Sequence, residues 1–211
     1  MLHTPLCDVL GIEVPIICAP FGPFDEVELA AAVCAAGGLG SLGTAVRPLP
    51  ELREQWGRLR GRTDRPFAIN HTVRPLDEDA FTATVEFGPA AISFHLAVCP
   101  DLIARAHDAG IRWIQQVMTR DQAEQALSAS ADVLVAQGSE AGGLGGFVST
   151  MVLVPQVVDL AGDVPVVAAG GIADGRGMAA ALALGAAGVV MGTRFLGQHR
   201  DGDQRAVDRR C

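Results

Sequence analysis

The sequence contains no lysine, and all 16 of its cationic residues are arginine. Without a lysine amine, the chain cannot form a Schiff base with a carbonyl substrate, and it cannot build the lysine-containing phosphate loop of P-loop nucleotidases. Cationic residues are also outnumbered, because the formal net charge at pH 7 is −8. Such a balance does not attract nucleic acid or an anionic membrane, so we expect neither as a partner.

Paired cysteines and long apolar runs are missing as well. The cysteines are Cys7, Cys18, Cys34, Cys99 and Cys211. Their number is odd and none stands in a CxxC pair, which favours free thiols in a reducing compartment and no metal site. The N-terminus has no basic segment followed by an apolar run, and no stretch is long and apolar enough to span a membrane. We therefore expect a cytoplasmic protein.

Short apolar runs alternate with helix-like segments along the 211 residues. The runs that predict strands are 14–18, 38–42, 67–70, 90–94, 113–117, 133–137, 165–169 and 188–191. The segments that predict helices are 26–36, 48–59, 77–87, 100–109, 120–127, 151–160 and 176–184. Unbroken apolar runs are typical of parallel strands that are covered on both faces. Eight such strand–helix steps predict a (β/α)₈ TIM barrel over residues 1–196, with a doubly wound open sheet as the alternative.

The C-terminal residues 197–211 depart from this pattern because they are almost entirely polar. A barrel needs an eighth helix to cover its first and last strands, and 204–210 offers little apolar surface for that role. We expect a barrel that lacks the usual C-terminal helix and cap. Apolar surface left uncovered in this way usually finds a partner, so a homo-oligomer is a possible consequence.

One glycine motif, Gly38 to Gly43, has the GxGxxG spacing of dinucleotide-binding proteins. That fingerprint follows a strand and begins a helix. Here a predicted helix precedes the motif, and Pro48 and Pro50 delay the next one. We interpret the glycines as a helix cap, a small-residue strand and a turn.

Two other glycine clusters end the seventh and eighth predicted strands. Gly170 and Gly171 follow the seventh, and Gly192 and Thr193 follow the eighth. In TIM barrels the loops after these two strands often bind phosphate, because glycine lets the anion approach backbone N–H groups. Tight turns alone are the alternative interpretation.

Amide side chains end two further predicted strands, Asn70 after the third and Gln137 after the sixth. A buried amide without a hydrogen-bond partner costs about 1–3 kcal/mol. Each amide can offer a donor and an acceptor to the edge of a heterocycle. Together with a phosphate site, they indicate a nucleotide-like cofactor.

These segments resemble those of nitronate monooxygenases, formerly called 2-nitropropane dioxygenases, in order over about residues 5–196. The segments that carry the resemblance are 15–21, 35–40, 66–70, 93–95, 136–143, 168–172 and 192–195. Enoyl reductases of the FabK type share the barrel and similar segments. The resemblance implies an FMN-dependent oxidoreductase that oxidises a small organic substrate, such as an alkyl nitronate, with oxygen or another acceptor. Two alternatives stay open: a FabK-like enoyl reductase with a nicotinamide donor, and a catalytically impaired or non-enzymatic flavin-binding barrel.

The resemblance also implies positions for the flavin. Ala19, Pro20 and Phe21 would lie against the ring, and Asn70 and Gln137 would bond it. The ribityl chain and phosphate would meet Gly142, Gly170, Gly171, Gly192 and Thr193, with Gly138 in the same glycine-rich segment as Gly142.

One residue departs from the family pattern. Family members usually have a histidine directly after this Ala-Gly-Gly segment, as the base that takes the α-proton of the substrate, but here the residue is Leu144. His71 and His95 follow or end the third and fourth predicted strands, and either could face the barrel mouth and act as the base. A hydrogen-bonded structural role is the alternative for both.

Overall fold

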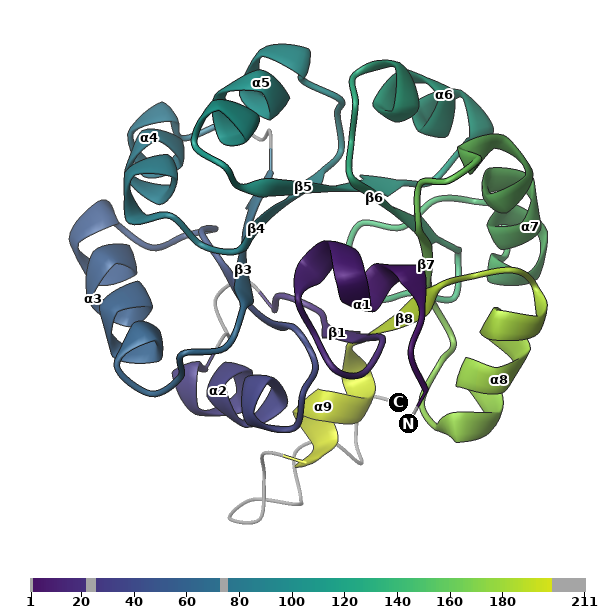
Figure 1. Cartoon of the computed structure of the whole chain (residues 1–211), viewed down its shortest axis with the longest axis horizontal. Coiled ribbons are helices and arrows are strands. Elements are labelled where there is room, and N and C mark those ends of the chain that lie inside the picture. Colours follow the sequence, from purple (N-terminus) through teal and green to yellow (C-terminus); the bar gives the residue numbers. More distant parts are fainter. Residues whose placement is uncertain (1, 22–25, 73–75, 199–211) are drawn as a thin grey trace.

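Figure 1 shows a computed structural model of the chain, in which residues 2–21, 26–72 and 76–198 are described. The strands are β1 (Ile16–Cys18), β2 (Gly40–Gly43), β3 (Phe67–Thr72), β4 (Ala91–His95), β5 (Arg112–Val117), β6 (Val133–Gln137), β7 (Val166–Ala169) and β8 (Gly188–Met191). The helices are α1 (Pro5–Leu10), α2 (Val27–Ala35), α3 (Leu49–Arg60), α4 (Glu78–Phe87), α5 (Pro100–Asp108), α6 (Arg120–Ser128), α7 (Thr150–Ala161), α8 (Gly175–Ala183) and α9 (Thr193–Gln198).

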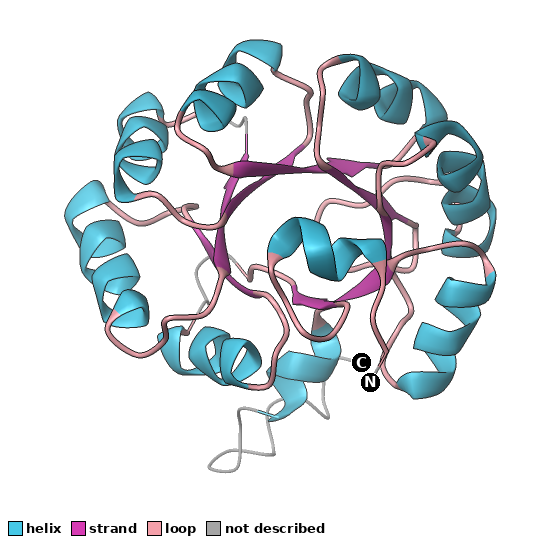
Figure 2. Ribbon diagram, viewed as in Figure 1, coloured by secondary structure: helices cyan, strands magenta, loops and turns pink. Residues whose placement is uncertain are grey.

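The eight strands form one parallel sheet in the order β1-β8-β7-β6-β5-β4-β3-β2. A bridge between Ile17 and Leu39 joins the two ends of this order. It is made by hydrogen bonds of 2.9 Å from the Leu39 N–H to the Ile16 carbonyl and from the Cys18 N–H to the Leu39 carbonyl. Helices α2 to α8 surround the ring of strands (Figures 1 and 2). The predicted (β/α)₈ barrel is confirmed, and the alternative prediction of a doubly wound open sheet is wrong.

Alternate residues of each strand face opposite sides of the barrel wall, which sorts the core into layers. In β3, Ala68 belongs to the cluster inside the barrel, whereas Ile69 packs in the layer between strands and helices. The layer between strands and helices includes Trp56 of α3 and Trp113 of β5, both fully buried.

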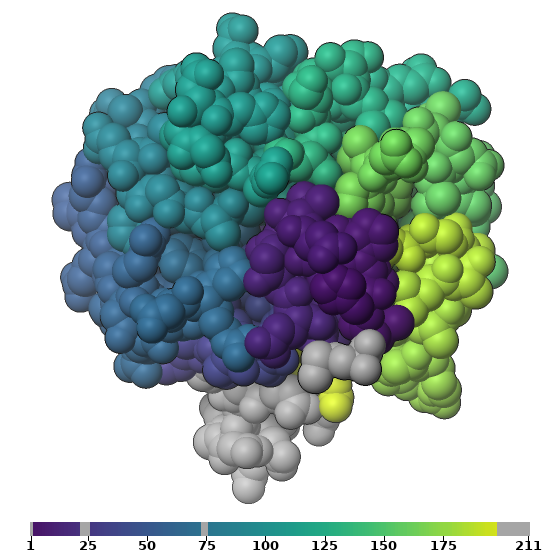
Figure 3. Space-filling view, in the orientation of Figure 1, coloured from purple at the N-terminus to yellow at the C-terminus, as the bar shows by residue number. Residues whose placement is uncertain are grey.

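Helix α1 closes the N-terminal end of the barrel, an element that the sequence pattern did not predict. Its Leu6 and Leu10 are buried in the same cluster as the interior strand residue Ala68. Figures 2 and 3 show this end, where α1 covers the centre of the ring. The helix begins with Pro5 and ends at Gly11, whose φ of 68° is left-handed. With only six residues, it is too short to show a helical period.

The last described helix, α9, has six residues, whereas α2 to α8 have nine to twelve. It runs to Gln198, two residues beyond the predicted end of the barrel. Residues 199–211 lie outside the described part of the chain. The predicted polar tail and its effect on association therefore stay predictions.

The structure also bears on the predictions about the Gly38–Gly43 motif and the cysteines. The Gly38–Gly43 segment follows α2 and forms β2, as interpreted. Gly40 is required there, because a Cβ atom at this position would lie 2.3 Å from the Ala30 carbonyl oxygen of α2. Cys7, Cys18, Cys34 and Cys99 are free thiols, as expected. Over the described ranges, no helix has both the length and the apolar character needed to cross a membrane.

Candidate active site at the barrel mouth

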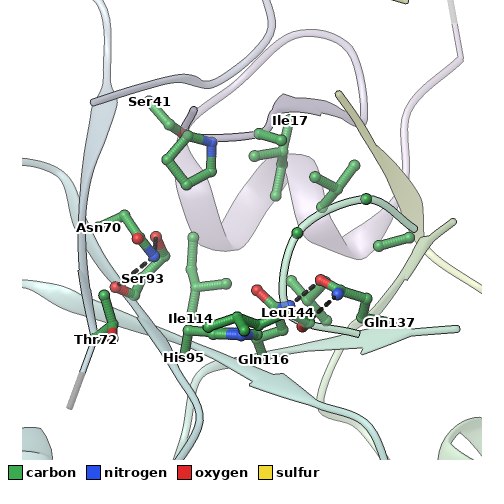
Figure 4. A pocket seen from close by; sticks show the side chains of 17 residues that line it. Ile17, Ser41, Asn70, Thr72, Ser93, His95, Ile114, Gln116, Gln137 and Leu144 are labelled. Carbon is green, nitrogen blue, oxygen red and sulfur yellow. Dashed lines mark hydrogen bonds between the residues drawn. The ribbon is translucent and has the colours of Figure 1, made fainter. Parts of the chain in front are cut away.

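A cavity of about 210 Å³ lies among the carboxyl ends of the strands (Figure 4). Its floor is apolar and includes Ile17, Ile114 and Val135, while polar side chains stand around it. Six of the residues named from the sequence line this cavity: Ala19, Pro20, Asn70, His95, Gln137 and Gly142. Leu144 lines it as well. The carboxyl ends of the strands are where TIM barrels carry their active sites.

Asn70 is held at one side of the cavity by its neighbour on the next strand. Its Nδ2 group donates to the Ser93 carbonyl at 3.2 Å and to the Ser93 hydroxyl at 3.0 Å. Asn70 and Ser93 are register partners in the β3–β4 ladder. Since these two bonds use both amide hydrogens, a ligand would meet the Oδ1 acceptor of Asn70.

Gln137 lies at the other side of the cavity, where its amide is hydrogen-bonded to that of Gln116. Only Gln137 was predicted from the sequence. The Nε2 group of Gln116 donates to Oε1 of Gln137, and the Nε2 group of Gln137 donates to the Leu144 carbonyl at 3.0 Å (Figure 4). Gln116 was not predicted, because β5 contains two adjacent glutamines, and sequence alone does not say which of them faces inward.

The loop that carries Leu144 forms one wall of the cavity (Figure 4). Glycines 142, 143, 145 and 146 flank Leu144, and Gly143 has a left-handed φ of 76°. The Leu144 residue is 50% exposed while it lines the cavity. A leucine cannot accept a proton, so this wall lacks the base that the family pattern has at this position.

Glu140 anchors the start of this loop to helix α7. Its Oε2 accepts hydrogen bonds from the Thr150 N–H at 2.8 Å and the Thr150 hydroxyl at 2.9 Å. Partial desolvation favours the neutral carboxyl, but the hydrogen bonds from Thr150 and Ser139 outweigh it and lower the pKa of Glu140. An ionised Glu140 thus fixes the loop and supports the beginning of α7.

The remaining predicted cofactor residues do not line the cavity. They are Phe21, Gly138, Gly170, Gly171, Gly192 and Thr193. Packing accounts for two of them, since a Cβ atom at Gly138 or Gly170 would lie 2.1 or 2.7 Å from the Thr150 hydroxyl. Gly171 has a left-handed φ of 69° and is exposed. A Cβ at Gly192 would lie 3.7 Å from Ala19 and Phe21. Because β7 and β8 are neighbours, both glycine clusters stand on one side of the mouth.

His71 does not face the barrel mouth, and that expectation is wrong. In β3 it alternates with Asn70 and Thr72, which line the cavity, so its side chain points toward the helices. There its Nε2 lies 2.9 Å from the Thr84 hydroxyl, and its Nδ1 lies 3.2 Å from the Thr44 hydroxyl. Burial lowers the pKa of His71 to about 4. His71 is a neutral structural histidine, and His95 alone of the two lies at the cavity.

The family model for nitronate monooxygenase matches residues 3–85 and 76–211. The chain belongs to the nitronate monooxygenase family. A nitronate monooxygenase of Paraburkholderia phytofirmans is 36% identical over an alignment of 244 positions, gaps included, that spans 90% of this chain and 65% of that protein. Two proteins that are named for other activities are more similar to this chain in sequence.

A (3aS,4S,5R,7aS)-5-hydroxy-7a-methyl-1-oxo-octahydro-1H-indene-4-carboxyl-CoA dehydrogenase of Mycobacterium tuberculosis is 41% identical over 198 residues, covering 92% of this chain and 56% of that protein. The structure of FabK from Thermotoga maritima superposes with a TM-score of 0.90 at 39% identity, over 93% of this chain and 63% of that one. The chain thus spans little more than half the length of the first of these relatives. The proteins that this chain resembles thus include both a monooxygenase and a dehydrogenase.

Proposed function

We propose that this chain forms the flavin-binding barrel of an FMN-dependent oxidoreductase that acts on an uncharged acyl group, such as that of an acyl thioester. The observation that carries this proposal is the charge of the cavity. Among the described residues that line it, none is an aspartate, glutamate or arginine. A substrate that is anionic at its reacting end would lose its hydration there without gaining a permanently positive side chain from these residues, which is costly.

The residues around the mouth suit an FMN. The Oδ1 acceptor of Asn70 and the paired amides of Gln116 and Gln137 can bond the polar edge of a flavin ring, while the apolar floor can contact its face. The exposed left-handed turn at Gly171 offers backbone without a side chain for a phosphate. When bound, FMN supplies hydride transfer to or from carbon.

The cavity is smaller than the roughly 300–1,000 Å³ of most ligand sites, since its volume is about 210 Å³. The glycine-rich loop around Leu144 forms the wall that can yield, because glycines on both sides of Leu144 give the backbone freedom to move. The backbone carbonyl of Leu144 accepts a hydrogen bond from Gln137, one of the proposed flavin contacts. Flavin binding therefore involves release of this hydrogen bond and outward movement of the loop.

In the proposed reaction, His95 is the residue that transfers a proton. Of the described residues around the cavity, it alone carries an imidazole, a side chain that can both donate and accept a proton. In an acyl thioester, hydride transfer to or from the β-carbon is accompanied by transfer of one proton at the α-carbon, next to the carbonyl. We assign this proton to the imidazole of His95, with Gln116 and Thr72 as polar neighbours on the adjoining strands.

Flavin titration followed by anaerobic reduction tests the proposal. The purified chain is titrated with FMN, reduced with NADPH or NADH, and then mixed with crotonyl-CoA or, separately while oxidised, with propane-2-nitronate. We expect FMN binding and re-oxidation of the reduced flavin by the thioester. Bleaching of the oxidised flavin by the nitronate at a comparable or faster rate would support the second candidate, nitronate oxidation, which the family match favours. Failure to bind FMN would refute both.

A further inference from the structure

The backbone directly after His95 is strained. Leu96 has a φ of 83°, one of three positive φ values at non-glycine residues in the described part of the chain. The left-handed region is unfavourable for leucine because of its Cβ atom. Such a conformation persists only where the surrounding structure enforces it, and strained residues of this kind concentrate at functional sites.

The side chain of Gln115 spans this strained segment. Its Nε2 donates to the Phe94 carbonyl at 3.3 Å and to the Ala97 carbonyl at 3.1 Å, so the two acceptors bracket His95 and Leu96. The same nitrogen lies 3.1 Å from the carbonyl of Gln116, which it also bonds. Gln115 is 1% exposed. Its two amide hydrogens are thus shared among three backbone carbonyls, of which Phe94 and Ala97 flank His95 and the strained Leu96.

The orientation of this amide is fixed by Trp113. The indole N–H donates to Oε1 of Gln115 at 3.0 Å, which directs Nε2 toward the loop carbonyls. Trp113 is fully buried, and its ring lies 5.1 Å from that of Phe94 and 6.3 Å from that of Phe81. Gln115 is also the register partner of Phe94 in the β4–β5 ladder. The clamp formed by Trp113 and Gln115 is therefore rigid.

Gln115 itself lies outside the cavity. Strand alternation places Gln116 and Ile114 at the cavity and turns Gln115 toward the helix layer. Any effect of Gln115 on the cavity must pass through the backbone that it holds. We propose that Gln115, oriented by Trp113, is a positioning residue that keeps Leu96 in its left-handed conformation and thereby directs the imidazole of His95 into the cavity. The inference rests on the proposed role of His95 in proton transfer.

Histidine NMR on the full chain tests this inference independently of turnover. The chain has five histidines, so ¹³C,¹⁵N-histidine labelling gives few signals, and His95→Gln identifies those of His95. Gln115→Met keeps the side-chain length and removes the amide. We expect the His95 signals to shift or split into more than one state in Gln115→Met, while the His71 signals stay in place. Gln122→Met is the matched control, because Gln122 bonds the Met118 N–H in the loop after β5 and not the 94–97 segment.

A second substitution tests the part played by backbone strain. Glycine adopts the left-handed conformation without a Cβ penalty. In Gln115→Met/Leu96→Gly we therefore expect the His95 signals to return toward their wild-type positions. In an active FMN-loaded enzyme, Gln115→Met should lower kcat by about 10²-fold, the effect of a misplacement of about 1 Å. The affinity for FMN should change much less, because Gln115 does not touch the cavity.

The NMR spectra distinguish failure of this inference from failure of the proposed function. A single, unshifted His95 signal in Gln115→Met overturns the inference, and so does a double variant that behaves like Gln115→Met. If Gln115→Met does not fold, Trp113→Phe keeps an aromatic ring at this position and removes the N–H that orients the amide, together with part of the indole ring; the same shift of the His95 signals is expected. Added FMN that leaves the wild-type His95 signals unchanged refutes the proposed function instead, since His95 then does not face the flavin.

Discussion

Acidification from pH 7.5 to 4 should destabilise the folded barrel by about 3 kcal/mol through His71 alone. Burial lowers the pKa of this imidazole from 6.5 to about 4 in the folded chain. The Thr84 hydroxyl donates to the Ala80 carbonyl at 2.9 Å, so it accepts from Nε2–H of His71. The lowered pKa keeps the imidazole neutral at pH 7.5. Protonation at low pH places a charge among Phe81, Thr84 and Thr44, and the carboxylate of Asp77 offsets only part of the cost of burying it.

The sign and size follow from proton linkage. Because the pKa is lower in the folded state, the unfolded chain binds more protons between pH 6.5 and 4. The contribution of His71 to stability is therefore complete above pH 6.5 and is lost as the pH falls toward 4. A shift of about 2.5 pKa units at about 1.36 kcal/mol per unit gives roughly 3 kcal/mol. That is a large share of the 5–15 kcal/mol that stabilise a typical domain.

Urea unfolding, followed by tryptophan fluorescence at several pH values, measures this effect. His71→Gln can still donate to Thr84 but cannot titrate, so its stability should fall less steeply with acid. The difference between wild type and variant should shrink by about 3 kcal/mol between pH 7.5 and 4. His3→Gln, which removes an exposed imidazole, is the control. A difference that stays constant over this pH range would refute the account of His71 as a buried neutral group.

Three further outcomes concern the mouth of the barrel. Gly171→Asp should abolish retention of FMN during purification, because it puts a carboxylate and a strained left-handed residue at the proposed phosphate turn. Gly57→Asp on α3 is the control, because it adds the same charge far from the proposed site. Stoichiometric FMN in purified Gly171→Asp would contradict the assignment. Leu144→His should raise oxidation of 2-nitropropane by about 10²–10⁴-fold over a low wild-type rate, measured as oxygen consumption, whereas Leu144→Gln should not. Asn70→Leu should weaken FMN binding about tenfold in a fluorescence titration, and an equal loss in Ser93→Ala would show that Asn70 has no direct role.

The sequence by itself determined the barrel and the end of it that carries the site. Eight apolar runs separated by helical segments leave few arrangements other than parallel strands covered by helices. Glycines and amides directly after these runs then fall at one end of the barrel, because parallel strands all end on the same side. Asn70 and Gln137 reach a common cavity for this reason, although their positions in the sequence differ by 67.

Tertiary structure decided which of two adjacent residues faces the cavity. His71 follows Asn70, and Gln116 follows Gln115, yet only Asn70 and Gln116 point inward. Strands of this barrel are buried on both faces, so both faces are apolar and the sequence carries no polar alternation to fix the phase. The phase is set instead by how each strand packs between the barrel interior and its covering helix. This is why the sequence named His71 and His95 alike, and only packing separated the buried structural imidazole from the one at the cavity.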